Sequence, residues 1–156
     1  MFTVAEVLLT AGIPFTAFTP WPEGNVFLTK ANQLIGGYKD LCRFRDRTAS
    51  YKGWQSHHVV ETDDLHRLGV ASNAPSRDDQ LCVLLPERAH IGRINSILRR
   101  ENPTKWQASG QALRRAYKEA YALVGDYCGA GEAAIQNELL AIVEAEFQKL
   151  GVRYRA

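Results

Sequence analysis

Two adjacent histidines, His57 and His58, stand in the stretch Trp-Gln-Ser-His-His-Val-Val at residues 54–60. They are two of the four histidines in the chain. Neutral imidazole is the commonest protein ligand for a metal ion, and it is also the side chain best matched to proton transfer near neutral pH. The pair therefore indicates two kinds of chemistry, metal binding and general-base catalysis.

The residues around the pair predict a β-strand, because β-branched side chains follow it. Neighbouring side chains of a strand point to opposite faces. We therefore expect His57 and His58 to have different roles, with one binding a metal ion and the other pointing at a substrate. The alternative is a satisfied core histidine beside a surface histidine, and the pair taken alone favours that alternative.

A third histidine belongs to a predicted helix. Residues 81–86 predict a short apolar strand, and Pro86 and Glu87 then suit the positive end of a helix that carries His90 in its first turn. A helix packed on the hairpin would bring His90 near the strand of His57. Two histidine ligands leave open positions for water and substrate, as a catalytic metal needs.

The remaining pattern predicts a small α+β single domain in three regions. Residues 1–53 are expected to be irregular apart from a short helix near residues 4–9, and "GNVFLTKANQLIG" fits a strand or a helix. Residues 54–101 contain the hairpin and helix, with a turn-rich loop between the two strands. Residues 102–156 carry apolar and aromatic side chains at helical spacing, which predicts two core helices with a stop at Gly151.

Composition excludes several classes of protein. The chain is 46% hydrophobic and 23% charged, which fits a folded core, and it has no apolar run of about 18 residues that would span a membrane. Glu6 and the absence of a basic leader argue against a cleaved signal peptide. Three scattered cysteines without a CxxC pair exclude a cysteine zinc site and predict free or buried thiols in a reducing compartment.

A net charge of +2 does not by itself imply nucleic-acid binding. The placement of charge is more informative, because "DLCRFRDRTASY" at residues 40–51 alternates in the way of a strand. Such a strand carries Arg43, Arg45 and Arg47 on one face, where they could contact the phosphate backbone of a nucleic acid. A solvated, charged edge strand is the alternative.

The segments "QSHHVVE", "NAP", "CVLLP" and "AHIGRIN", followed by "YKEAYALVGDY", together resemble the His-Me finger, or HNH/endonuclease VII, nucleases. More narrowly, they resemble the SHH-signature toxin nucleases of bacterial polymorphic toxin systems. The resemblance covers residues 54–150 and is sharpest over residues 55–95. It implies a ββα-metal core, in which a β-hairpin and a helix hold one divalent cation, and a metal-dependent endonuclease activity.

The same resemblance implies a biological setting. The expected protein is an antibacterial effector that is cytoplasmic in its producer and acts in the cytoplasm of a target bacterium. A cognate immunity protein and a secretion carrier are its expected partners, besides a nucleic-acid substrate, and no membrane is involved. DNA is favoured over RNA. Mg²⁺ is the favoured cation, and two histidine ligands keep Mn²⁺ and Zn²⁺ as alternatives.

Carried onto this chain, the resemblance makes His57 and His90 the metal ligands and His58 the general base. Asn73, in "SNAP", corresponds to the middle polar residue that braces the loop and orients the base in such folds. Asp79 is the second candidate for that role, and a plain turn asparagine is the alternative reading of Asn73.

The chain departs from the family pattern because the helix offers no second ligand one turn after His90. Arg93 occupies that position, on the same side as His90, where it could contact a phosphate or stabilise transition-state charge. A solvated arginine is the alternative. The nearest carboxylates are Glu61 and Asp64, and the third metal ligand stays open.

Two rival interpretations remain. The first is a non-catalytic module that binds nucleic acid or protein on a nuclease-like fold. The second is a structural metal module, whose histidines hold the fold together and which would melt when the metal is chelated.

Overall fold

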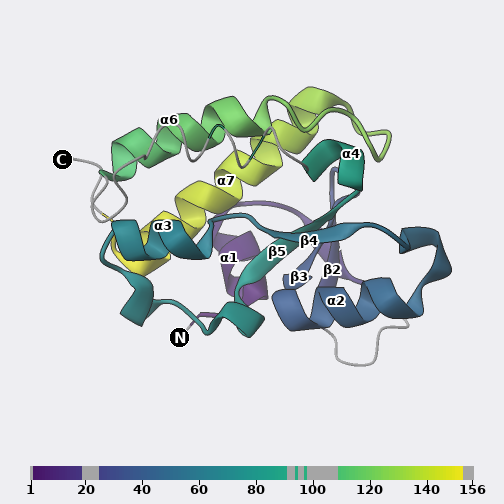
Figure 1. The fold of residues 1–156 in the computed structure, drawn as a ribbon, viewed down its shortest axis with the longest axis horizontal. Coiled ribbons are helices and arrows are strands. Elements are labelled where there is room, and N and C mark those ends of the chain that lie inside the picture. The colour runs from purple at the N-terminus through teal and green to yellow at the C-terminus, as the bar shows by residue number, and fades with distance from the viewer. Residues whose placement is uncertain (1, 19–24, 91–93, 95–96, 98–108, 153–156) are drawn as a thin grey trace.

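The computed structural model describes residues 2–18, 25–90, 94, 97 and 109–152 (Figure 1). Within these residues five strands form one antiparallel sheet in the order β1-β2-β3-β5-β4. The strands are β1 Phe15–Ala17, β2 Val26–Thr29, β3 Leu34–Gly37, β4 Gln55–His58 and β5 Leu81–Leu85. The helices are α1 Val4–Thr10, α2 Tyr38–Arg47, α3 Thr62–Arg67, α4 Glu87–His90, α6 Gly110–Tyr121 and α7 Glu132–Leu150. The expected α+β class is confirmed.

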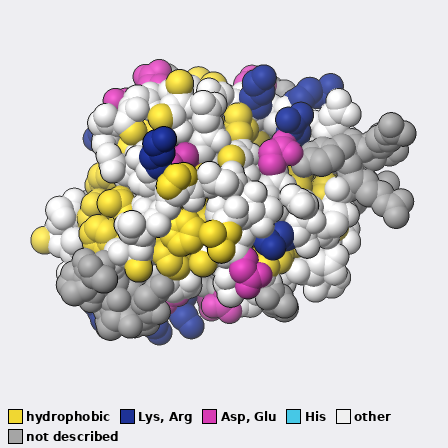
Figure 2. All heavy atoms as spheres, turned by 180° about the vertical axis from the view of Figure 1, so that it is seen from behind, with side chains coloured by type: hydrophobic (Ala, Val, Ile, Leu, Met, Phe, Trp, Pro, Cys, Tyr) yellow, Lys and Arg dark blue, Asp and Glu magenta, His cyan; other side chains and the backbone are white. Residues whose placement is uncertain are grey.

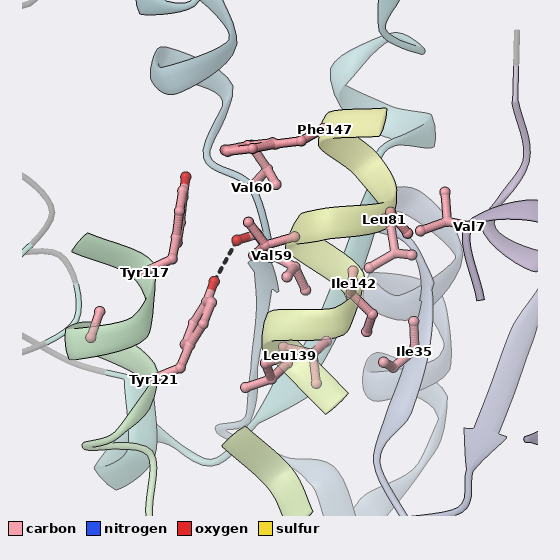
Figure 3. Packing of buried hydrophobic residues seen from close by; sticks show 14 of the residues in the cluster. Val7, Ile35, Val59, Val60, Leu81, Tyr117, Tyr121, Leu139, Ile142 and Phe147 are labelled. Atoms are coloured by element: carbon pink, nitrogen blue, oxygen red, sulfur yellow. Dashed lines mark hydrogen bonds between the residues drawn. The ribbon is translucent and has the colours of Figure 1, made fainter. Parts of the chain in front are cut away.

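The sheet lies between two layers of helices (Figure 1). Helices α1, α6 and α7 cover one face and form the larger core, part of which Figure 3 shows, and α2 covers the other face. Strand β5 is buried on both faces, with Leu81, Val83 and Leu85 in the larger core and Cys82 and Leu84 against α2. Burial on both faces explains why β5 is a continuous apolar run rather than an alternating one.

The extended strand predicted for residues 40–51 is wrong, because most of this segment forms α2. Its buried side chains Leu41 and Phe44 are three positions apart and pack on the sheet in the smaller core. A short alternating run fits both a helix and a strand, and packing against the sheet decides between them. Arg43 and Arg47 are exposed and share one side of the helix, whereas Arg45 donates to the carbonyl oxygen of Trp54 at 3.4 Å.

The first 53 residues contain more regular structure than their prolines and glycines suggest, namely α1, α2 and strands β1–β3. The segment that fitted either a strand or a helix is the β2–β3 hairpin. A buried carboxylate from α7 holds its turn, because Glu138 accepts hydrogen bonds from the Ala31 amide at 2.8 Å and the Gln33 side chain at 2.8 Å. This contact spans more than 100 residues of sequence, so local patterns did not reveal it.

The C-terminal helices agree with their predicted pattern. The Ser109 side chain accepts a hydrogen bond from the Ala112 amide and so caps α6, and Gly151 ends α7 in the left-handed conformation with φ of 75°. Gly69, with φ of 72°, likewise follows the short helix α3 as expected. All three cysteines are free thiols. Among the described residues, no helix is long and apolar enough to cross a membrane.

Candidate functional site

The two histidines end β4 and point to opposite faces of the sheet, as the strand period predicts. His57 lies opposite Val83, on the side of α6 and α7, and only 3% of its surface is exposed. His58 lies opposite Cys82, on the side of α2, where its ring stacks on the ring of Tyr38 with centroids 4.9 Å apart. Each imidazole therefore has its own environment.

The hydrogen bonds of Tyr121 determine which nitrogen of His57 carries the proton. The Tyr121 hydroxyl donates its single proton to the carbonyl oxygen of Val59, which can only accept (Figure 3). The hydroxyl oxygen must therefore accept from His57, whose Nε2 lies 2.9 Å away. It follows that Nε2 of His57 carries a proton, so Nδ1 is the only ring nitrogen of His57 that can hold a lone pair.

One turn earlier on α6, Tyr117 holds the chain that follows the histidines. Its hydroxyl accepts from the Glu61 amide at 2.8 Å and donates to the Asp64 carboxylate at 2.5 Å. Burial raises the pKa of Tyr117 and of Tyr121 well above the usual tyrosine value, so both hydroxyls stay protonated. The sequence pattern indicated that these tyrosines are core residues, and it missed that their hydroxyls also position residues 59–64.

The backbone of a distant loop orients His58. Its Nε2 lies 3.1 Å from the carbonyl oxygen of Arg77, which only accepts, so Nε2 carries the proton and Nδ1 the lone pair. No described residue donates a hydrogen bond to that Nδ1. Burial lowers the pKa of His58, and the positive charge of Arg77 lowers it further, against the opposing effects of the Arg77 carbonyl and Asp78. His58 is therefore neutral near pH 7, as a general base must be.

Both histidines line an open depression with a volume of about 280 Å³ at the end of β4. Its lining residues are Tyr38, Ser56, His57, His58, Glu61, Thr62, Asp63 and Arg77. Acidic residues and an arginine thus share the lining with the two histidines, so the depression has residues suited to a cation and to an anion. No described histidine side chain is visible on the face shown in Figure 2.

The structure distinguishes the two carboxylates that the sequence left open as further metal ligands. Asp64 is fully buried, where it pairs with Arg67 and accepts from Tyr117, so its oxygens face the core. Glu61 lines the depression together with His57. Of the two, Glu61 is the carboxylate placed beside the histidines.

The other predicted site residues have different placements. Helix α4 contacts β4, so the backbone of His90 belongs to a helix beside the histidine strand, but its side chain lies outside the described residues, as does all of Arg93. Asn73 donates to the Leu150 carbonyl oxygen at 3.2 Å and does not line the depression. Asn73 therefore ties the loop to the end of α7, and the carbonyl of Arg77, rather than Asn73, hydrogen-bonds to His58.

Asp79, the second candidate for orienting the base, accepts from the Ser76 hydroxyl at 3.0 Å. None of Arg43, Arg45 and Arg47 lines the depression. Among the described side chains, no group of three or more histidine, cysteine, aspartate or glutamate residues is arranged to hold a metal ion. The side chain of His90 is not among these described side chains.

No family model, curated protein or solved structure matches this chain. The function is therefore inferred from the chemistry of the depression.

Proposed function

We propose that the protein is a metal-dependent endonuclease that hydrolyses phosphodiester bonds in nucleic acid, with DNA favoured over RNA. The observation that carries this proposal is the state of His58. Its ring is held by Tyr38 and the Arg77 carbonyl, its pKa is lowered, and the residue lines an open depression. A neutral, oriented imidazole of this kind is equipped to take a proton from water.

In the proposed reaction the water oxygen bonds to phosphorus while the bond from phosphorus to the leaving oxygen breaks. The proton of the attacking water passes to Nδ1 of His58. The carbonyl of Arg77 keeps the Nε2 proton in place and accepts more strongly from the imidazolium that forms, since hydrogen bonds from charged donors are stronger. The lowered pKa ensures that His58 is unprotonated before the step.

His57 and His90 are the proposed ligands of the cation, in a ββα-metal arrangement of β4, β5 and α4. His57 fits this role because its Nε2 bonds to the Tyr121 hydroxyl, and an outer hydrogen bond of that kind commonly orients a ligating histidine. Glu61 is the carboxylate placed to add an oxygen ligand. When bound, Mg²⁺, Mn²⁺ or Zn²⁺ would stabilise charge on the phosphate and the leaving oxygen.

The biological role belongs to the same proposal. We place the protein as an antibacterial effector with a cognate immunity protein, on the resemblance of its histidine segments to SHH-signature toxin nucleases. Arg43 and Arg47, exposed on one side of α2, are proposed contacts to the nucleic-acid backbone, together with Arg45 and Arg93. Such contacts add affinity and salt dependence without sequence preference.

The test is cleavage of plasmid DNA and of total RNA with Mg²⁺, Mn²⁺ or Zn²⁺ by wild type, His58→Ala and His66→Ala. His66 is an exposed histidine on α3 and serves as the matched control. We expect His58→Ala to lower the rate about 10²- to 10⁴-fold while the protein stays folded, because the general base is lost. His66→Ala should cleave like wild type.

Three outcomes would contradict the proposal. Equal cleavage by His58→Ala would remove His58 as the base. No cleavage of either polymer with any of the metals would favour a binding module on a nuclease-like fold. A large fall in melting temperature on chelation, without cleavage, would favour a structural metal site.

A further inference from the structure

Arg77 lies beside the proposed base in two ways. It begins the short 3₁₀ turn Arg77–Asp79, in the loop between α3 and β5. Its carbonyl oxygen accepts the Nε2 proton of His58, and its guanidinium carbon lies 4.6 Å from the ring centroid of Tyr38, the ring on which His58 stacks. One residue thus holds the imidazole with its backbone and brings a positive charge to the same depression.

The charge of Arg77 is available to a ligand. The side chain is exposed, lines the depression, and forms no ion pair with any described carboxylate. Its contact with Tyr38 uses the face of the ring and leaves guanidinium N–H groups free to donate. A guanidinium is always protonated, and its planar fork matches two oxygens of a phosphate.

The loop that carries Arg77 is fixed on both sides. The Tyr38 amide donates to the Gln80 carbonyl at 3.0 Å. The side chain of Gln80 donates to the Pro75 carbonyl at 3.0 Å and accepts from the Thr62 hydroxyl at 3.3 Å. The guanidinium is therefore carried by a loop that is ordered before any ligand arrives, which reduces the entropy lost on binding.

Other arginines are less suited to this position. Arg45 is occupied by Asp46 and the Trp54 carbonyl, and neither Arg43 nor Arg47 lines the depression. Among the described arginines, Arg77 alone lines it.

We propose that Arg77 binds the phosphate group that is presented to His58, donating guanidinium N–H groups to its non-bridging oxygens. That this phosphate belongs to a polynucleotide rests on the proposed function, whereas the affinity of Arg77 for phosphate can be measured without any cleavage. Arg77 is then a substrate-binding residue whose backbone also orients the base.

The first experiment is an NMR titration of the protein with inorganic phosphate, in the absence of metal, followed through the ring signals of His58. The variants are Arg77→Ala, Arg77→Lys and, as matched control, Arg115→Ala, which removes an exposed arginine of α6. We expect Arg77→Ala to weaken phosphate binding about tenfold or more, because a charge-assisted pair is lost. Arg77→Lys should keep part of the affinity, and Arg115→Ala all of it.

A second readout separates charge from structure. With His58→Ala as the non-cleaving background, removing Arg77 should also reduce the slope of log binding constant against log salt by about 0.7 to 0.9 for DNA.

Unchanged phosphate affinity in Arg77→Ala would overturn the inference, even if wild type cleaves nucleic acid. The same holds if wild type binds no phosphate. If phosphate binding depends on Arg77 but no polymer is cleaved, the inference about Arg77 stands and the proposed nuclease function fails.

Discussion

Replacing Tyr121 with phenylalanine tests the hydrogen-bond chain that sets the state of His57. The substitution removes one oxygen and leaves the ring in place. It deprives two buried groups of their partner, the Nε2–H of His57 and the carbonyl oxygen of Val59. His57 is 3% exposed and Val59 is fully buried, so solvent does not replace the lost hydroxyl at either group.

The expected loss of stability follows from these two groups. An unpaired buried polar group costs about 1–3 kcal/mol, so we expect Tyr121→Phe to lower the free energy of unfolding by about 3 kcal/mol. For a chain of 156 residues that loss corresponds to a fall of about 6–12 °C in melting temperature. Tyr51→Phe is the matched control, because the Tyr51 hydroxyl bonds to no described residue, and it should change stability by less than about 0.5 kcal/mol.

Urea denaturation of both variants measures the loss, and ¹⁵N NMR of the imidazole shows which nitrogen of His57 carries the proton. In wild type Nε2 should be protonated, and in Tyr121→Phe that preference should weaken. A loss below about 1 kcal/mol, or a wild-type His57 protonated on Nδ1 alone, would refute the reasoning. If His57 also binds the cation, Tyr121→Phe should weaken metal affinity about 10- to 100-fold.

Three further predictions concern charge. Burial raises the pKa of the Glu146 carboxyl from 4.5 to about 8, so between these pH values the folded protein keeps a proton that the unfolded chain loses. The free energy of unfolding should therefore fall by up to about 1.4 kcal/mol per pH unit as pH rises through this range. In urea denaturation at several pH values, Glu146→Gln should show a weaker pH dependence. Arg67→Ala removes the ion-pair partner of the buried Asp64 and should lower the free energy of unfolding by about 3–5 kcal/mol, measured by thermal denaturation. Arg114→Ala breaks an exposed ion pair and should lower it by less than about 1 kcal/mol. Because the pKa of His58 is lowered from 6.5, kcat/KM should hold just below pH 6.5 and fall only as pH drops through the lowered value. Stability should decline earlier, between pH 6.5 and the lowered value, since the unfolded chain protonates there and the folded protein does not.

Long periodic segments were predictable because many residues repeat the same preference. Helices α6 and α7 follow from such patterns. The short strand β5 and the Gly69 stop after α3 were predictable from local signals, a continuous apolar run and a glycine. Short segments without such signals were not predictable. Residues 40–51 carry an alternation that a strand and a helix both satisfy, and only the burial of Leu41 and Phe44 against the sheet selects the helix. The β2–β3 hairpin similarly depends on Glu138 of α7.

For the candidate site, the amino-acid sequence by itself determined that His57 and His58 face opposite ways, because side chains alternate along a strand. It also placed the helix of His90 directly after β5. Only the tertiary structure decided the proton positions, because Tyr121 and Arg77 reach the histidines from segments 64 and 19 residues away. Hydrogen bonds across such separations depend on how α6 and the loop before β5 pack against the sheet, and no local pattern encodes that packing.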